Sequence, residues 1–545
     1  MYKNLKIIAR LSSIKSLVGM ILLIGISFIL ETISIASIFP ILDIITSENY
    51  LIKYDFVFSN ISFLQTYNEK ELFIFLFSFF LLIFLVRTIY LIFFNFYKIN
   101  FLENIRYKLS DIVVSSYLKK DFIFFSKIKS SEIIRNVLSE TNYIINYINQ
   151  LITLITEILI LLSLSLIIVF NSSPVVLYSL ALFILIFFLL RFILKKSIKK
   201  YSNIRINADA QKINVLEQII NGIKEIKINK KEDFFNDYFN YQNYNTIKSS
   251  KFLKKIQSLP RFILEMLLML ILCFWIIFNL NTNNLVNTLP FIGLVVFSSV
   301  RILPSFNRII LATQGMKYGE PAIKAITELV NIKKNLFDNR QNNKIIFKDL
   351  IIKNLKFNFD KKSLIKLEDF QILKGDIIGI KGDNGSGKST LINIMLGLIN
   401  VENKKIFING KDINLLKNQW QDIVSVTSQD PFILNENLEF NISLDKEEID
   451  NDNLNSVLEL INFDQNQNKL ELFKNLSGGN KQKISIARSI YKDPQVYFFD
   501  EPTTFLDTNT INNLLKFIKN NRDKTFVIVS HDEKIIDLCN KIIDL

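Results

Sequence analysis

Histidine, cysteine and tryptophan are scarce in this chain. Its 545 residues include one histidine, His531, two cysteines and two tryptophans. Cys273 lies in an apolar run and Cys539 lies near the C-terminal end, so their separation gives neither a disulfide framework nor the spacing of a metal site. A single histidine likewise argues against a cluster of protein metal ligands.

Acidic residues are outnumbered by basic ones. The chain has 51 Asp and Glu against 65 Lys and Arg, which gives a net charge of +14. Such a balance also occurs in nucleic-acid-binding proteins, but here the basic residues cluster beside long apolar runs, as the positive-inside rule describes. We therefore favour membrane topology over nucleic-acid binding and expect no nucleic-acid partner.

Long apolar runs are what the chain has in excess. Hydrophobic residues make up 50% of it, and 48 residues are Phe. Six stretches approach the roughly 20 apolar residues that a bilayer span requires; they are 17–45, 72–97, 151–170, 175–191, 262–280 and 289–311. The first is too long for the apolar core of a signal peptide, so we expect a retained span.

The charges between these stretches predict the orientation. The N-terminal tail and the connections after the second and fourth stretches are basic, whereas the connection after the first is acidic and the other two are uncharged. Because basic connections stay inside, residues 1–330 are predicted to form an all-α, six-span domain of an inner membrane, with both chain termini in the cytoplasm.

The two inner connections are long and contain almost no proline or glycine. We expect them to be helices that continue past the bilayer, reaching roughly 35–40 Å into the cytoplasm at about 1.5 Å per residue. Each has an aromatic turn, at 121–125 and 232–235. Exposed aromatic clusters mark contact surfaces, so we predict that these turns dock on a cytoplasmic domain; the alternative is solvated helix with local packing.

A polar linker, 331–344, precedes a second domain, 345–545. Short apolar runs at 344–347, 377–380, 496–499 and 526–529 alternate with helical patterns. This alternation predicts an α/β domain with a largely parallel core sheet.

A phosphate-binding loop lies in this domain. Residues 382–389 match G-x-x-x-x-G-K-[ST] between a predicted strand and a predicted helix, which is the context that gives the pattern its meaning. Lys388 would neutralise the β- and γ-phosphates and Ser389 would hold Mg²⁺. The candidate nucleotide-binding residues of the loop are Gly382, Asn384, Gly385, Ser386, Gly387, Lys388, Ser389 and Thr390.

Two carboxylates end the apolar strand predicted at 496–499. Asp500 is placed to orient Mg²⁺ and Glu501 to polarise an attacking water; the alternative is a pair of solvated acids. His531 follows the strand predicted at 526–529, where its ring would reach a γ-phosphate unless it only packs or caps.

A second glycine-rich turn, Leu476-Ser477-Gly478-Gly479, opens another helix. A helix N-terminus is an anion site, yet one nucleotide has little use for two such sites far apart in sequence. We infer that Ser477, Gly478 and Gly479 serve a nucleotide held by a second copy of the chain.

Together these features resemble the ATP-binding cassette (ABC) transporters, in particular exporter-type half transporters. The resemblance covers the region from about residue 345 onward, and the six spans are similar to the exporter arrangement. It implies ATP and Mg²⁺ as cofactors and a homodimer as the working unit. It further implies that Gln429 is the Q-loop residue that contacts Mg²⁺, that 504–507 is the D-loop with Asp507, and that Phe359 stacks on adenine.

The chain departs from the family pattern in three places. Asn480 replaces the usual Gln after the two glycines, and Phe359 replaces a common Tyr. The segment 462–475 lacks the glycine- and glutamate-bearing loop through which exporters often contact the membrane domain, which makes one route of coupling doubtful. Glu501, Gln429 and His531 are all present, so both sites of a homodimer are expected to hydrolyse ATP.

Charged residues inside predicted spans are costly and point to function. The candidates are Glu31, Arg87, Arg301 and Arg308. The stretches 26–32 and 301–310 are similar to bacterial lipid-linked oligosaccharide flippases, which implies an amphipathic, pyrophosphate-linked lipid as substrate and the bilayer as its medium.

Two alternatives stay open. The arginines could have no substrate role and instead snorkel or form pairs, for instance with Glu31. The substrate could be a different lipid, a drug or a peptide. A non-transport ABC ATPase is a further alternative, against which the six spans argue.

Overall fold

The computed structural model describes residues 12–37, 41, 69–171, 174–280, 289–331, 345–359, 363–401, 404–445, 449–463 and 476–545. By its internal contacts the chain divides into two compact units. The first comprises Met1–Lys120 and Lys127–Phe337, and the second comprises Asp121–Ser126 and Asp338–Leu545.

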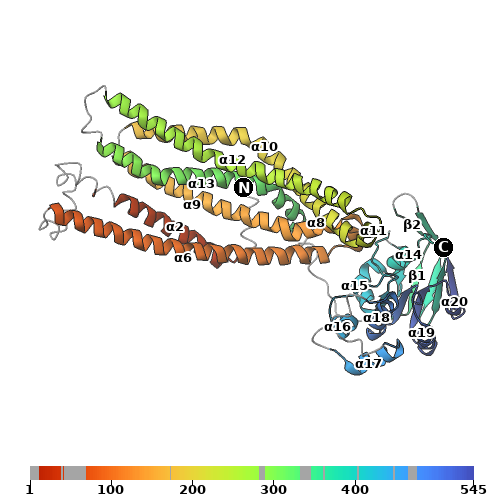
Figure 1. The fold of residues 1–545 in the computed structure, drawn as a ribbon. Helices are drawn as coiled ribbons and strands as arrows, with labels where there is room; N and C mark the ends of the chain where they lie inside the picture. Colours follow the sequence, from red (N-terminus) through yellow and green to blue (C-terminus); the bar gives the residue numbers. More distant parts are fainter. Residues whose placement is uncertain are drawn as a thin grey trace. The chain divides into compact units, whose positions relative to one another are not determined.

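Long helices that run alongside one another build the first unit (Figure 1). They are α2 (Ile14–Ala36), α6 (Glu69–Leu118), α8 (Ser130–Arg135), the π-helical turn η2 (Asn136–Glu140), α9 (Thr141–Asn171), α10 (Pro174–Asn221), α11 (Ile223–Ile228), α12 (Glu232–Leu280) and α13 (Leu289–Asn331). The short α7 (Phe122–Lys127) interrupts this series between α6 and α8.

The predicted spans are confirmed as helical wherever the structure describes them. Five lie inside α6, α9, α10, α12 and α13. The first is helical in α2 as far as Ala36, and most of its remainder falls outside the described residues. Within the described part of the chain, three helices are long and apolar enough to cross a membrane: Ile14–Ser34, Lys70–Leu118 and Ser130–Ser163. The helices α6, α10 and α12 run for 50, 48 and 49 residues, which is more than the roughly 20 residues that a span requires.

A buried ion pair ties α10 to the start of α9. The Arg205 guanidinium donates to both carboxylate oxygens of Glu140 at 3.2 Å, and both side chains are fully buried. The guanidinium also lies 3.5 Å from the Tyr143 ring centre and 5.3 Å from that of Tyr318 on α13. Glu140 ends the π-helical turn η2, and such turns change which way the following side chains face.

Among its described residues, the second unit contains three sheets, with helices packed around them. The central one has five parallel strands in the order β11 (Lys541–Asp544), β5 (Ile377–Lys381), β10 (Thr525–Val529), β9 (Val496–Asp500), β8 (Val424–Thr427). An antiparallel sheet has the order β4 (Phe370–Leu373), β1 (Asp349–Ile352), β6 (Ile406–Ile408), β7 (Lys411–Asp412), and β2 (Leu355–Phe359) pairs with β3 (Ser363–Leu367). The predicted α/β architecture with a parallel core sheet is confirmed.

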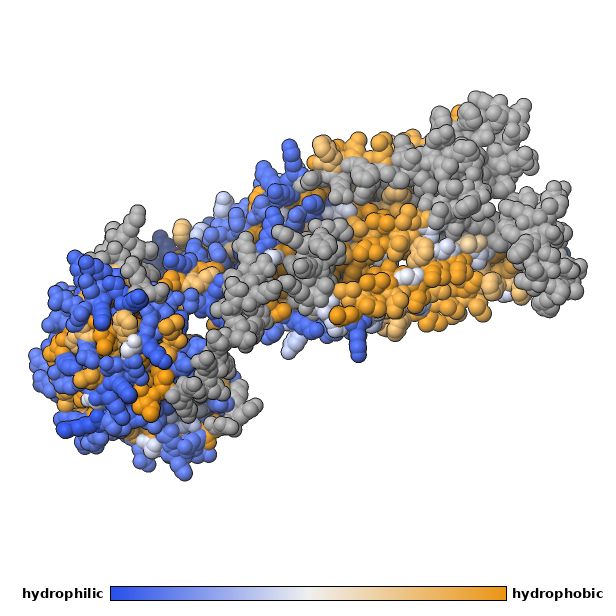
Figure 2. Space-filling model, turned by 180° about the vertical axis from the view of Figure 1, so that it is seen from behind, coloured by the Kyte–Doolittle hydropathy of each residue, from blue (hydrophilic) through white to orange (hydrophobic). Residues whose placement is uncertain are grey.

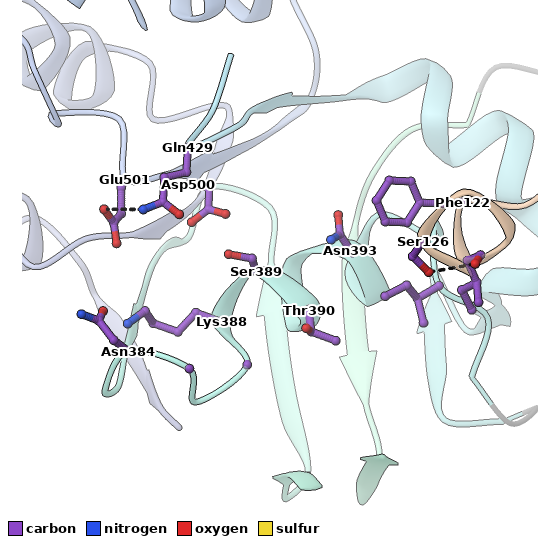
Figure 3. Close-up of a pocket in the computed structure, with 14 residues that line it drawn as sticks. Phe122, Ser126, Asn384, Lys388, Ser389, Thr390, Asn393, Gln429, Asp500 and Glu501 are labelled. Carbon is purple, nitrogen blue, oxygen red and sulfur yellow. Dashed lines mark hydrogen bonds between the residues drawn. The ribbon is translucent and has the colours of Figure 1, made fainter. Parts of the chain in front are cut away.

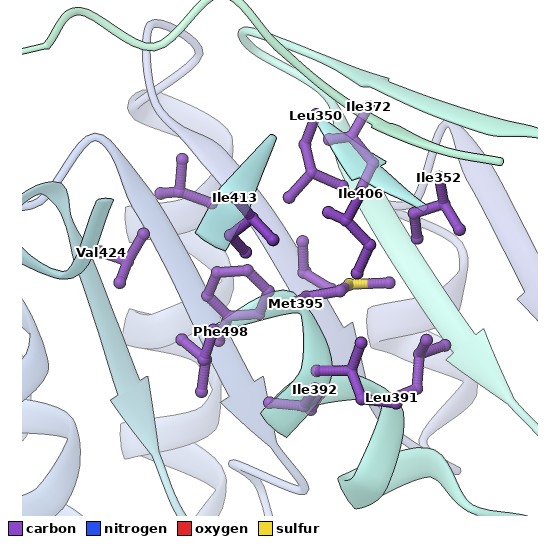
Figure 4. Packing of buried hydrophobic residues seen from close by; sticks show 14 of the residues in the cluster. Leu350, Ile352, Ile372, Leu391, Ile392, Met395, Ile406, Ile413, Val424 and Phe498 are labelled. Atoms are coloured by element: carbon purple, nitrogen blue, oxygen red, sulfur yellow. The ribbon is translucent and has the colours of Figure 1, made fainter. Parts of the chain in front are cut away.

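Each face of the parallel sheet has its own core. Along β9, Phe498 belongs to the core that includes α14 (Lys388–Met395) and the antiparallel sheet (Figure 4), whereas Tyr497 and Phe499 face the opposite side. This alternation is the period-two geometry of a strand buried on both faces. The second core packs against α16 (Leu438–Ser443), α17 (Asn451–Leu460), α18 (Gly478–Tyr491) and α19 (Thr508–Asn520).

The strand predicted at 344–347 is wrong. Lys344 lies outside the described residues, residues 345–348 have no regular structure, and the first strand begins at Asp349. Phe347 is buried, but its N–H donates to the Gln495 side chain at 2.6 Å, and Gln495 in turn donates to the Ile345 carbonyl. A side-chain amide thus satisfies this backbone in place of a neighbouring strand.

Replacing Arg205 with Ala should destabilise the first unit by about 3–5 kcal/mol, because Glu140 is left as a buried charge without its partner. The matched control is Arg106→Ala, which removes an exposed pair with Glu103 (3.0 Å) and should cost less than about 1 kcal/mol. Thermal unfolding of the full chain in detergent measures both. Equal melting temperatures for the two variants would contradict the assignment.

Candidate functional site

Glycines shape the phosphate loop between β5 and α14. Gly382, Gly385 and Gly387 have φ of +147°, +85° and +103°, the region that only glycine enters at little cost. A Cβ on Gly382 would also lie 2.6 Å from the Leu545 carbonyl oxygen. The loop can therefore turn its N–H groups inward and lead directly into the N-terminus of α14, which is how such loops hold phosphate.

The Lys388 ammonium lies in the mouth of this loop. It donates to the Gly382 carbonyl at 2.6 Å, to the Asp383 carbonyl at 3.2 Å and to His531 Nε2 at 3.1 Å. The structure thus brings the only histidine of the chain to the phosphate loop, from the end of β10.

Asp500 is the last residue of β9 and hydrogen-bonds with Ser389. Burial raises the pKa of the Asp500 carboxyl; the Ser389 hydroxyl and the Lys388 ammonium oppose this rise, and the neighbouring Glu501 charge adds to it. A hydroxyl and a carboxylate side by side next to a phosphate loop are the oxygen ligands that Mg²⁺ prefers.

Glu501 has a strained backbone, with φ of +51°. Its N–H donates to the Val529 carbonyl at 2.9 Å, and Gln429 and Thr504 each donate to its Oε2 at 3.4 Å. Strain of this kind in a non-glycine residue persists where surrounding contacts impose it, often at functional sites. Thr504 is the first residue of the segment 504–507 identified above, but its contact with Glu501 was not predicted from the sequence.

These side chains line one cavity of about 380 Å³ (Figure 3). Its lining residues are Phe122, Ile123, Ser126, Asn384, Gly385, Gly387, Lys388, Ser389, Thr390, Asn393, Ile399, Gln429, Asp500 and Glu501. The residues fit Mg-ATP: the Ser386 hydroxyl at its edge is buried without a hydrogen-bond partner, and the loop presents a lysine and inward N–H groups. The side chain of Phe359, at the end of β2, lies outside the described side chains.

The second glycine-rich turn starts α18 but does not line this cavity. Ser477 caps the helix by accepting the Asn480 N–H at 3.3 Å, so Asn480 keeps the local turn through its backbone. A Cβ on Gly479 would lie 2.5 Å from the Phe505 carbonyl oxygen, which explains the glycine. Among the residues described as lining the cavity, none comes from Ser477–Gly479.

Two neighbours of this turn connect it to the catalytic loop. Lys483 forms an ion pair with Asp507 at 2.7 Å, and this ion pair holds the pKa of the Asp507 carboxyl well below its usual range. Asp507 also caps α19 by accepting the Thr510 N–H. Gln482 donates to the Glu501 carbonyl at 3.4 Å. Gln482 and Lys483 lie within four residues of the glycine-rich turn in the sequence, but these two contacts were not predicted from it.

The first aromatic turn belongs with the second unit. Asp121 pairs with Lys417 at 3.3 Å, and Ile123 packs against the core beneath the phosphate loop. Phe122 and Ser126 reach the cavity itself (Figure 3). The segment 464–475, in which a coupling loop was predicted to be missing, lies outside the described residues.

Three of the four charged candidates of the helical unit, Glu31, Arg87 and Arg308, form ion pairs. Arg87 donates to Glu31 at 2.8 Å, and both are largely buried, as the pairing alternative allowed. Arg308 donates to Glu157 of α9 at 2.6 Å, while the Arg308 side chain stays 48% exposed. Glu157 was not a candidate, although it was the one acidic residue in the span predicted at 151–170. Arg301 lies on α13, and its side chain is outside the described ones.

Comparison with known proteins identifies the class. The chain matches the family model for the ABC transporter transmembrane region over residues 20–304 and that for the ABC transporter over residues 366–504. The first match alone spans more than half of the chain, so the chain belongs to the ABC transporter family. Cassettes of this family use ATP with Mg²⁺.

Individual proteins similar to this chain show its fold more specifically. A solved bacterial Atm1-family ABC exporter with ATP bound is similar with a TM-score of 0.79 over 97% of this chain and 93% of that one, at 14% identity. A probable ABC transporter ATP-binding/permease protein of Haemophilus influenzae is 29% identical over 36% of this chain and 37% of its own length. The RTX-III toxin translocation ATP-binding protein of Actinobacillus pleuropneumoniae is 29% identical over 36% and 30%. The chain therefore spans about a third of these curated relatives and has the exporter fold.

The raised pKa of Asp500 predicts an acid-sensitive ATPase. Because this carboxyl keeps its proton at a higher pH than a free Asp, activity should fall on acidification before an ordinary Asp would protonate. Mg²⁺ competes with the proton, so raising Mg²⁺ should move the acid limb to lower pH. Rates measured across pH at two Mg²⁺ concentrations check this. Asp523→Asn should keep the wild-type profile, and an acid limb insensitive to Mg²⁺ would exclude Asp500 as its source.

Proposed function

We propose that the chain is an ATP-driven half exporter that works as a homodimer in the inner membrane, with its cassette and both termini in the cytoplasm. One observation carries the proposal. The cassette has two glycine-rich helix starts, at α14 and α18, and only the first opens on the nucleotide cavity. The second glycine-rich helix start, Ser477–Gly479, would bind the nucleotide of a partner copy. Two ATP molecules would then be held between two cassettes.

The side chains around the cavity divide the chemistry. Bound Mg-ATP supplies the phosphoanhydride bond that is cleaved. Lys388, which donates to His531 in this structure, would neutralise charge at the phosphates, and Ser389 and Asp500 would hold Mg²⁺. Glu501 holds the proton of the attacking water, and Gln429 fixes the Glu501 carboxylate through the contact at Oε2.

In this proposal, the movement that closes the two cassettes is transmitted to the transmembrane helices by the aromatic turns at 121–125 and 232–235. The Asp121–Lys417 pair and the packing of Ile123 support this role for the first turn. The same turn lines the nucleotide cavity through Phe122, so a change in the cavity acts directly on it. The expected result is alternating access of the membrane domains.

For the substrate, we propose a lipid-linked oligosaccharide or a similar pyrophosphate-linked lipid, flipped across the membrane. Arg308 supports this best among the candidates, because its guanidinium is half exposed although it is paired with Glu157. Arg87 is 13% exposed and its charge is neutralised by Glu31, so it serves packing of α6 on α2. Arg301 lies seven residues before Arg308, two turns or about 10 Å along α13.

The dimer predicts cooperative hydrolysis. ATPase rate plotted against ATP concentration in proteoliposomes should be sigmoidal, with a Hill coefficient above one and at most two, since two sites close together. Native mass measurement of the Glu501→Gln variant with ATP should give twice the chain mass, because slowed hydrolysis keeps the cassettes closed. A hyperbolic rate curve together with a monomer mass would refute the account.

Neutralising Arg308 tests the substrate. The variant Arg308→Ala/Glu157→Gln removes the pair without leaving a buried charge, and we expect it to lose at least about 90% of pyrophosphate-lipid flipping, a barrier change of about 1.4 kcal/mol, while basal ATPase persists. The control Arg106→Ala should flip normally. Stimulation of ATPase by drugs or peptides and not by lipid-linked glycans would favour the alternative exporter class.

A further inference from the structure

The exposed side chains of α10 and α12 change from apolar to basic at one level. On α10, Phe192 and Ile193 are 83% and 59% exposed, and on α12 Phe262 is 64% exposed. Beyond them, within about two helical turns, both helices carry exposed lysines. Arg261, next to Phe262, is bonded to Glu265 at 2.8 Å and is not counted with these lysines. We call these the basic belt: Lys196, Lys199, Lys200, Lys251, Lys254 and Lys255.

The packing of the two helices aligns the two halves of the belt. Tyr201 stacks on Phe252 with ring centres 3.9 Å apart, and Ile198 and Ile256 share one buried cluster. In this antiparallel register, position 199 lies opposite 255 and position 200 opposite 254. The apolar-to-basic change at 193 and at 262 therefore falls at the same height on both helices.

No acidic side chain on these helices neutralises the belt. Neither 192–208 nor 238–264 contains Asp or Glu. Within the described residues, none of the six lysines forms an ion pair. Glu320 of α13 interacts electrostatically with Lys199, but its carboxylate is already bonded to Lys317 at 3.0 Å. Six net positive charges thus remain on one surface.

The position and chemistry of the belt indicate its ligand. Position 200 lies about 10 Å along α10 from the exposed Ile193, at about 1.5 Å per residue, which is within reach of lipid head groups at an interface. Figure 2 shows the hydrophobic surface of the helical unit passing into hydrophilic surface. All six residues are lysine, a flexible point charge, and none is arginine, whose planar fork suits one fixed phosphate.

We propose that the basic belt binds anionic phospholipid head groups of the leaflet at this boundary. The lysines act together as a diffuse electrostatic surface, and the exposed apolar side chains beyond them lie against the acyl chains. The belt would hold anionic lipid beside α10 and α12 whichever substrate the protein moves, so the proposal does not depend on the substrate proposed above.

The test uses the full chain in nanodiscs of phosphatidylcholine with a minor fraction of phosphatidylglycerol. The variant carries Lys→Gln at 199, 200, 254 and 255. The matched control carries the same four-charge change on exposed cassette lysines: Lys348, Lys516, Lys519 and Lys534. Lipid retained after extraction is measured by native mass spectrometry as the ratio of phosphatidylglycerol to phosphatidylcholine.

We expect the belt variant to lose this enrichment at least about tenfold, since each lysine near an anionic surface contributes about fivefold. The cassette control and a Lys→Arg version of the belt should keep it, and added salt should reduce it only where the belt charge is intact. Equal enrichment in the belt variant and the cassette control would show that these lysines set topology alone and would overturn the proposal.

Two further outcomes are decisive. Loss of stimulation by a polyprenyl-pyrophosphate with unchanged phosphatidylglycerol retention would assign the belt to the substrate, against the proposal. If the variant with four substitutions does not purify as folded protein, the single variants Lys199→Gln and Lys255→Gln replace it. Each should lower the phosphatidylglycerol enrichment, and unchanged enrichment in both would overturn the proposal.

Discussion

Parallel pairing of the five-stranded sheet is the constraint on which the site depends. Because β5, β8, β9 and β10 run in the same direction, their carboxyl ends meet at one edge of the sheet. The residues that follow these four ends are the phosphate loop, the segment with Gln429, the Asp500–Glu501 pair and His531. Groups that lie up to 149 residues apart in the chain are therefore side by side, as the carboxyl-end rule for open α/β sheets describes.

A second constraint acts on the helical unit: a charged side chain that is buried there needs an oppositely charged partner. Glu140 with Arg205 and Glu31 with Arg87 are closed pairs whose members are largely hidden. Arg308 with Glu157 differs, because only the carboxylate is buried. In the proposed function, the exposed Arg308 guanidinium is the charge that a substrate would meet.

Much of this was predictable because it is encoded locally. The phosphate loop matches a fixed residue spacing, and buried strands such as β9 and β10 appear as apolar runs. The long helices α6 and α9 follow from long segments without proline or glycine. The pairs were not predictable in the same way. Glu157 and Arg308 are 151 residues apart, and Lys388 and His531 are 143 apart, so only the fold determines which charges meet.

The strand wrongly predicted at 344–347 is a further case in which a contact between residues far apart in the chain decides the local structure. Three apolar residues after Lys344 satisfy a strand pattern, but the backbone around Phe347 is hydrogen-bonded to the Gln495 side chain, far along the chain. Likewise the contacts of Lys483 and Gln482 with the catalytic loop depend on how α18 meets β9, which no local pattern in the sequence states.

The central claim is that each nucleotide is held by Lys388 of one copy and Ser477 of the other. Mixing two inactive chains, Lys388→Ala and Ser477→Arg, tests it most directly. A mixed dimer contains one site with both changes and one site with neither, so the account predicts that ATPase activity returns on mixing, although each variant alone is inactive. If both groups served the same nucleotide within one chain, every site would carry a defect, and no activity on mixing would contradict the account.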